Sequence, residues 1–348
     1  MASDEQLLTL LREHSSLKWN IEYKTSRLSN HINHGIIALH RLGASDEKIR
    51  RFIQLYQQKL EPIQEAKPRY LDCLQLVRDS ALDVNGLLEK NFSELASGLC
   101  AALFHGLTHT GYGTSAKCPK MVADGLAYIK YDFVAPKLDA TELAKPLAGT
   151  MDALQALCSF RDDAELHVLL KERFAGSGSS KFVRIFEQEI AAQLMGYADQ
   201  ISLPEPQADS ALELALTVYG GCTERPNNFF LLHGATSAWA LKNILQSVSF
   251  DPSVVNTALR VHLIGLLAVY GALGAPVVEE IRTDLSEVGG PPRDWQSIAA
   301  ECVDISVDRD EHSYKIVQVC RQMALERPEK EEMFKMIAER SLKYPLLS

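Results

Sequence analysis

Apolar residues recur at three- and four-residue steps along almost the whole chain, and this helical period constrains the fold more than any other feature. Residues 4–13 begin with acidic side chains, which favour a helix N-terminus. Residues 45–60 begin with a capping-box pattern at Ser45. The same period recurs over 70–89, 93–110, 121–131, 141–159, 181–198, 209–219, 229–247, 254–273, 295–303, 312–325 and 330–342. Because no alternating runs bounded by hairpin turns interrupt it, the sequence predicts an all-α fold of roughly a dozen or more helices.

The breaks between these segments are short, and they predict one helical domain over residues 1–348. They fall at residues 67–68, 175–180, 203–206, 225–228 and 289–292. Short breaks are typical of loops within one packed body. At about 150 residues per domain the length would also allow two domains. Hydrophobic residues make up 46% of the 348-residue chain, which is enough for one large core.

The charge balance argues against several kinds of partner. Lys and Arg number 36 against 45 Asp and Glu, a net charge of -9, and no basic block occurs, so we expect neither nucleic-acid nor membrane binding. We find no signal peptide and no run of about 18 uncharged apolar residues. The seven cysteines are scattered without a C-x-x-C pair, which favours reduced thiols in a cytoplasmic protein.

Histidine is followed by glycine more often than chance predicts. Ten histidines and 20 glycines in 348 positions give about 0.6 His-Gly dipeptides at random, whereas the chain has three, at His34, His105 and His233. Each lies in an apolar helical segment, where glycine costs about 1 kcal/mol relative to alanine. The glycines could mark tight helix crossings with hydrogen-bonded core histidines, or could leave room for a ligand or metal beside the imidazole.

The surroundings of these histidines favour a binding site. His31 and His34 are three residues apart and His105 and His109 four apart, so each pair shares a helix face. Small residues surround them, as they do at His233. Histidines that converge inside a helical bundle are a common way to build a metal site. No single local pattern fits a known ligand motif, because H-E-x-x-H and a repeated Glu-x-x-His are both absent.

A further candidate lies near the C-terminus, where Asp308 or Asp310 can cap a helix. His312 and Lys315 then lie on its apolar seam. A buried ammonium is costly unless it is paired or neutralised. A buried Lys315 would therefore need a partner or a neutral amine. Alternatively, the charged end of Lys315 reaches water past the end of the helix.

Other signatures are weak or missing. The glycine-rich segment 176–181 lacks the spacing of a phosphate-binding loop and is interpreted as a flexible loop between helices. The chain has no dinucleotide fingerprint, no flavin motif and no G-x-S-x-G elbow.

Four motifs stand in a characteristic order along the chain: Asn30–Leu39 followed by Arg41–Ala44, Phe104–Tyr112, Phe230–Ser237 and Asp310–Lys315. Together they resemble the questin oxidase-like family over about residues 20–325. The resemblance implies a mostly helical oxygenase. The family's namesake activity is an NADPH-linked, Baeyer–Villiger-type ring opening of an anthraquinone. It also implies a non-haem iron in a histidine-rich site that can include a carboxylated lysine.

The resemblance carries specific residues over to this chain. The implied metal ligands are His34, His105, His233, His312 and Lys315, with Lys315, His109 and His31 as catalytic candidates. We therefore expect an all-α cytoplasmic oxidoreductase that holds one Fe(II), with NADPH as the implied reductant. Its expected partners are dioxygen and an aromatic or polyketide-like ketone or quinone. Two alternatives remain open: a metal-dependent hydrolase on the same ligands, and a non-catalytic helical interaction protein.

Overall fold

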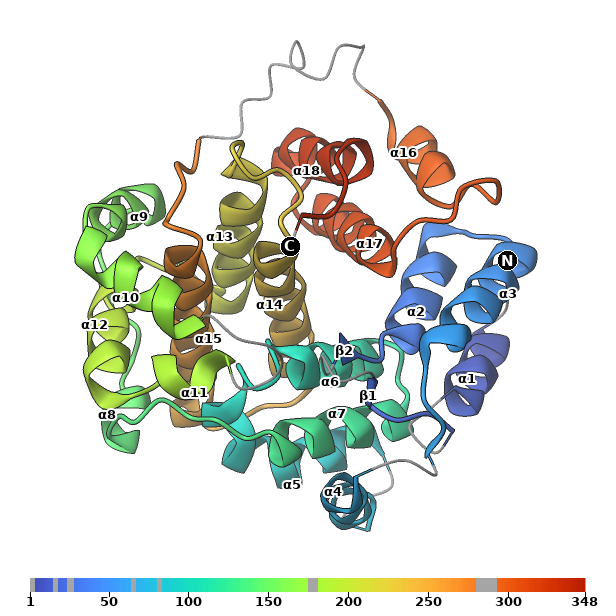
Figure 1. Cartoon of the computed structure of the whole chain (residues 1–348), viewed down its shortest axis with the longest axis horizontal. Coiled ribbons are helices and arrows are strands. Elements are labelled where there is room, and N and C mark those ends of the chain that lie inside the picture. The colour runs from blue at the N-terminus through green and yellow to red at the C-terminus, as the bar shows by residue number, and fades with distance from the viewer. Residues whose placement is uncertain are drawn as a thin grey trace.

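The chain folds into helices, as its periodicity predicts. The computed structural model describes residues 4–14, 18–23, 28–63, 67–79, 83–174, 181–279 and 293–347. Within these ranges there are 18 α-helices and one two-stranded antiparallel sheet, so the all-α prediction is confirmed (Figure 1). The glycine-rich segment predicted as a loop at 176–181 lies outside the described residues except for its last position, at which α11 begins, and the break at 289–292 lies outside them entirely.

The N-terminal third contains the sheet and the first helices. Its elements are α1 (Asp4–Glu13), β1 (Glu22–Tyr23), β2 (Leu28–Ser29), α2 (Ile32–Leu42), α3 (Asp46–Tyr56), α4 (Pro68–Arg78), α5 (Val84–Leu95), α6 (His105–Ser115) and α7 (Pro119–Tyr131). In the sheet, Glu22 pairs with Ser29 and Tyr23 with Leu28. Short 3₁₀ turns follow α3 (Gln57–Lys59) and α5 (Ala96–Gly98).

The remaining helices complete the body. They are α8 (Ala140–Leu143), α9 (Ala153–Arg161), α10 (Ala164–Phe174), α11 (Lys181–Ile185), α12 (Gln188–Ala198), α13 (Gln207–Gly221), α14 (Phe229–Ser247), α15 (Pro252–Ala272), α16 (Trp295–Cys302), α17 (Glu311–Glu326) and α18 (Glu331–Lys343), with a 3₁₀ turn at Pro328–Lys330. Figure 1 shows α1–α3 on one flank and α9–α12 on the opposite flank. One continuous cluster of buried apolar side chains runs from Leu7 to Ala338.

Side-chain caps begin several of these helices where the sequence predicts. Ser45 accepts the Lys48 N–H at 3.1 Å and starts α3. The capping box itself is incomplete, because Lys48 stands where glutamate would return the hydrogen bond. Asp310 caps α17 by accepting the His312 N–H at 3.0 Å.

Several helix predictions are wrong in their extent. The periods over 70–89, 141–159 and 181–198 each cover parts of two helices, which are α4 and α5, α8 and α9, and α11 and α12. The period over 93–110 predicts a single helix, but α5 ends at Leu95 and α6 begins at His105. Between them Ala102, Leu103 and Phe104 all have positive φ angles, of 50°, 56° and 63°. Three consecutive left-handed residues cannot continue a right-handed helix, whatever their apolar spacing.

Close helix crossings bring the central helices together. A Cβ at Gly106 of α6 would lie 2.8 Å from the Ile129 nitrogen of α7, and a Cβ at Gly111 would lie 2.6 Å from the Ala240 carbonyl oxygen of α14. Glycine lets backbones approach this closely. Helix α6 is thereby held between α7 and α14, which places His105 beside His233.

Helix α15 is the one described helix that is long and apolar enough to cross a membrane, but 78% of its most apolar window is buried inside the protein. Its composition is therefore that of a core helix.

Candidate metal centre

All the histidines and the lysine singled out from the sequence lie in one buried group, which we call the histidine cluster. Its members lie at or within five residues of the N-terminal ends of four helices, α2, α6, α14 and α17, and each is at most 8% exposed. They are His31, His34, His105, His109, His233, His312 and Lys315. Side chains separated by more than 280 residues in sequence therefore meet in one place.

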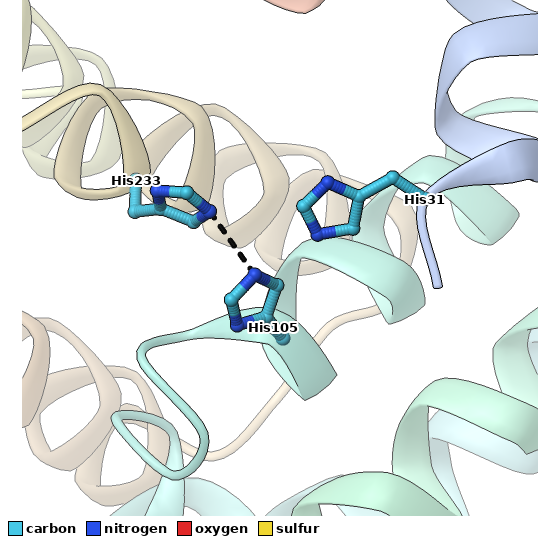
Figure 2. Close-up of side chains that lie close together, drawn as sticks. All are labelled: His31, His105 and His233. Atoms are coloured by element: carbon cyan, nitrogen blue, oxygen red, sulfur yellow. Dashed lines mark hydrogen bonds between the residues drawn. The ribbon is translucent and has the colours of Figure 1, made fainter. Parts of the chain in front are cut away.

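Three ring nitrogens of the cluster face one another directly. His233 Nε2 lies 3.0 Å from His105 Nε2 and 3.3 Å from His312 Nε2. His31 belongs to the same group, because its ligand atom lies within 4.8 Å of those of His105 and His233. Figure 2 shows His31, His105 and His233 converging from three separate helical segments.

The opposite nitrogens of these rings fix their tautomers. His233 Nδ1 is 2.7 Å from the Phe229 carbonyl oxygen, and His105 Nδ1 is hydrogen-bonded to the Ala102 carbonyl oxygen. A carbonyl only accepts, so each Nδ1 carries the proton and each Nε2 of a neutral ring presents a lone pair. His312 Nδ1 lies 2.5 Å from Asp310 Oδ1, which orients this ring in the same way.

Burial keeps the two central rings neutral. Desolvation lowers the pKa of His105 to about 3, although its hydrogen bond to Ala102 opposes the shift. The pKa of His233 is also far below its ordinary value, because of burial first and the neighbouring His105, His312 and Lys315 second. Two neutral imidazoles then point lone pairs at each other across 3.0 Å with no proton between them. A cation between them removes this repulsion.

The nitrogen separations fit a transition-metal site. Two nitrogen ligands held about 2.1 Å from one metal are about 3.0 Å apart at a right angle and about 3.4 Å apart at a tetrahedral angle. The observed 3.0 and 3.3 Å fall at these values. An Nδ1–H donated to a carbonyl or carboxylate is the usual support of a metal-binding histidine.

Glu311 is a functional candidate that the sequence analysis missed. It is buried at the first position of α17, and its Oε1 lies 3.3 Å from His31 Nδ1 and 3.6 Å from His312 Nδ1. Tyr56 donates its hydroxyl to Glu311 at 3.4 Å and accepts the His31 N–H at 3.0 Å. Burial raises the pKa of Glu311, and His312 opposes this shift. The residue could also belong to a second metal-binding combination with His31 and His312.

Among the described residues, His34 and His109 lie outside the groups of side chains whose ligand atoms are close enough to bind one metal. The His34 ring centroid is 5.1 Å from that of His31 and 4.9 Å from that of His109, and the ring stacks on Tyr112 at 5.0 Å. Neither residue belongs to a combination of three ligands among the described residues. These distances favour His31, not His34, beside His105 and His233, and the roles of His34 and His109 stay predictions.

Lys315 is fully buried, so the alternative in which its charged end reaches water is wrong. Among the described residues its Nζ has no hydrogen-bond partner. Desolvation lowers the pKa of Lys315 to about 8, while Glu311 and Asp310 oppose the shift. About a tenth of this amine is therefore neutral at pH 7, and the neutral form is the nucleophile.

The glycines that follow His105 and His233 serve helix packing and do not leave space for a ligand. A Cβ at Gly106 would meet the backbone of α7, and one at Gly234 would lie 2.7 Å from Leu266 Cδ1 of α15. Of the two alternatives, tight helix crossings are therefore confirmed at these two positions, and room for a ligand beside the imidazole is not. These glycines support the cluster indirectly, because they set how closely the histidine-bearing helices approach.

A comparison with known families shows which family the chain belongs to. The family model described as Questin oxidase-like matches residues 77–320, so the chain belongs to the questin oxidase-like family and an oxidoreductase is the enzyme class implied. The matched region contains His105, His233, His312 and Lys315, whereas His31 and His34 lie before it. No curated protein matches the chain.

Proposed function

We propose that this protein is an oxygenase with one Fe(II) held by the four-histidine group: His31, His105, His233 and His312. The observation that carries the proposal is the pair of neutral rings of His105 and His233, whose lone pairs face each other at 3.0 Å. A protein interior retains such a contact when a cation relieves it. His312 Nε2, 3.3 Å from His233, extends the same donor set.

Iron is the metal that best suits both the imidazole ligands and the redox chemistry of the family. Imidazole ligands suit iron, zinc, copper and nickel alike, so the ligands alone do not choose. Membership in a family of oxidoreductases favours a redox metal over zinc. Bound Fe(II) would supply the activation of dioxygen, a role that flavin fills in many oxygenases.

The protein's own residues orient and shield this centre. The Ala102 and Phe229 carbonyls and Asp310 hold the rings of His105, His233 and His312 by their Nδ1–H groups. Burial of every ring excludes bulk water, which strengthens electrostatic interactions inside the site. Glu311 places a carboxylate behind His31 and His312.

Lys315 would add a negative ligand after carboxylation. Its neutral amine attacks the carbon of carbon dioxide. An N–C bond forms as one C=O π bond breaks, and one N–H proton passes to solvent, which gives a carbamate with carboxylate-like oxygens. Such an anion offsets part of the metal's charge and is a hard oxygen donor. The buried position of Lys315 supports this role, as does the lack of a hydrogen-bond partner for its Nζ in the part of the chain that the structure describes.

The substrate that we propose is an aromatic or polyketide-like ketone or quinone. Phe229 is half-buried, and its ring centroid lies 4.3 Å from that of His233 and 5.2 Å from that of His312. Asp310, which holds His312, is 41% exposed. An apolar ring could approach from this side and stack on Phe229. We propose NADPH as the reductant and the cytoplasm as the location. NADPH would bind without a Rossmann domain, because the chain has no dinucleotide fingerprint.

Isotope incorporation tests this proposal. Purified protein is loaded with Fe(II) and incubated with a panel of hydroxyanthraquinones and naphthoquinones, with and without NADPH, under ¹⁸O₂. We expect oxygen consumption and a product that carries at least one ¹⁸O atom. Turnover by Zn(II)-loaded protein without oxygen, with label entering from H₂¹⁸O only, would instead identify the hydrolase.

A further inference from the structure

The backbone just before His105 has an unusual conformation. Ala102, Leu103 and Phe104 are all in the left-handed region, and none of them is glycine. Each such residue brings its Cβ close to the following carbonyl oxygen, and consecutive ones are rare. Strain of this kind persists only where surrounding contacts enforce it, and it is concentrated at functional sites.

This left-handed turn gives His105 its orientation. The turn brings the Ala102 carbonyl oxygen back toward His105, where it accepts both the backbone N–H, at 3.3 Å, and the ring Nδ1–H. The ring is therefore held by a carbonyl only three residues earlier in the chain. Because Nδ1 is fixed in this way, Nε2 points toward His233.

Two neighbouring parts of the fold clamp the turn. On one side Asp132, which follows α7, accepts the Ala102 N–H through Oδ2 at 3.0 Å. On the other side the Phe104 ring packs against Phe182 and His262, at centroid distances of 5.5 and 5.4 Å. A Cβ at Gly265 of α15 would lie 2.9 Å from this ring, so α15 closes over it.

We propose that Asp132 is a positioning residue for the metal centre. It fixes the amide of Ala102, the carbonyl of the same residue fixes the Nδ1–H of His105, and His105 then presents Nε2 to the metal. The inference rests on the proposed four-histidine centre and adds a half-buried carboxylate outside the histidine cluster. Sequence spacing does not indicate this role, because Asp132 lies 30 residues from Ala102.

The test uses Co(II) as the probe, with its affinity and its d–d absorption spectrum as readouts. Loss of an outer-shell partner of a metal ligand weakens metal binding about 10- to 100-fold. We expect Asp132→Ala to bind Co(II) about tenfold more weakly, with a shifted spectrum. Asp132→Asn keeps an acceptor oxygen and should restore most of the affinity. Asp152→Ala is the matched control, since it removes a carboxylate that accepts backbone N–H groups at α9 and should leave the affinity unchanged.

A double mutant separates positioning from general destabilisation. If Asp132 acts through His105, Asp132→Ala should have no further effect on Co(II) affinity in a His105→Ala background. Should Asp132→Ala fail to fold, Asp132→Glu keeps the charge, displaces the carboxylate and should also weaken binding. Wild-type affinity and spectrum in folded Asp132→Ala or Asp132→Glu would overturn the positioning role alone. Wild-type protein that binds no Co(II) would overturn the metal centre itself.

Discussion

The burial of the histidine cluster predicts that the metal-free protein loses stability in mild acid. Desolvation lowers the pKa of both His105 and His109 to about 3, whereas an unfolded histidine has a pKa of 6.5. Between these values the unfolded chain binds more protons than the folded chain, so stability falls as the pH falls below 6.5. One unit below 6.5, each of the two residues costs about 1.4 kcal/mol, or about 3 kcal/mol together.

Urea unfolding in the presence of a chelator at pH 7.5 and 5.5 measures this loss. Wild-type protein should lose at least about 3 kcal/mol, because the pKa values of His31, His34 and His233 are lowered in the same direction. His109→Leu should lose about 1.4 kcal/mol less than wild type, since it removes one buried titrating group. His40→Leu, outside the cluster, should keep the full loss. Equal stability of the wild-type protein at the two pH values would refute the reasoning.

Three further predictions concern the cluster and its support. Metal analysis should show that His31→Ala loses most of the bound metal and that His34→Ala retains it. The reverse result would make His34 the ligand. Lys315→Ala should be inactive, and short carboxylic acids should partly restore its activity. Lys315→Arg should stay inactive because guanidinium remains cationic. An active Lys315→Arg variant would show that Lys315 has a structural role only. Gly106→Ala should lower stability by about 1–3 kcal/mol, because its Cβ meets backbone, and Gly234→Ala by less, because only the end of Leu266 must move. Equal melting temperatures of these two variants would contradict that contrast.

Much of the helical fold could be predicted from local sequence. The segments 4–13 and 229–247 coincide with α1 and α14, because acidic first-turn residues and the Asn228 cap act within a few residues of each helix start. The left-handed turn at Ala102–Phe104 could not be predicted in this way. It depends on Asp132 and on packing against α15, which are contacts made only in the folded protein.

The sequence predicted which histidines and lysine gather in the candidate site, but not which of them face one another. His-Gly dipeptides and the family motifs indicated the buried histidines and Lys315. Which of His31 and His34 faces His105 depends on the start of α2 at Ile32, and helix starts are poorly defined by periodicity. Glu311 was missed because an acidic residue in a first helical turn is usually a solvated one.

The most direct test of the account is the metal content of protein purified without a histidine tag, compared with that of the His233→Ala variant. His233 is central because its Nε2 faces both His105 and His312. The account predicts close to one iron per wild-type chain, almost none in His233→Ala, and a wild-type melting temperature that falls in chelator. Metal-free wild-type protein that takes up no Fe(II) and melts at the same temperature with and without chelator would contradict it and favour a non-catalytic helical protein.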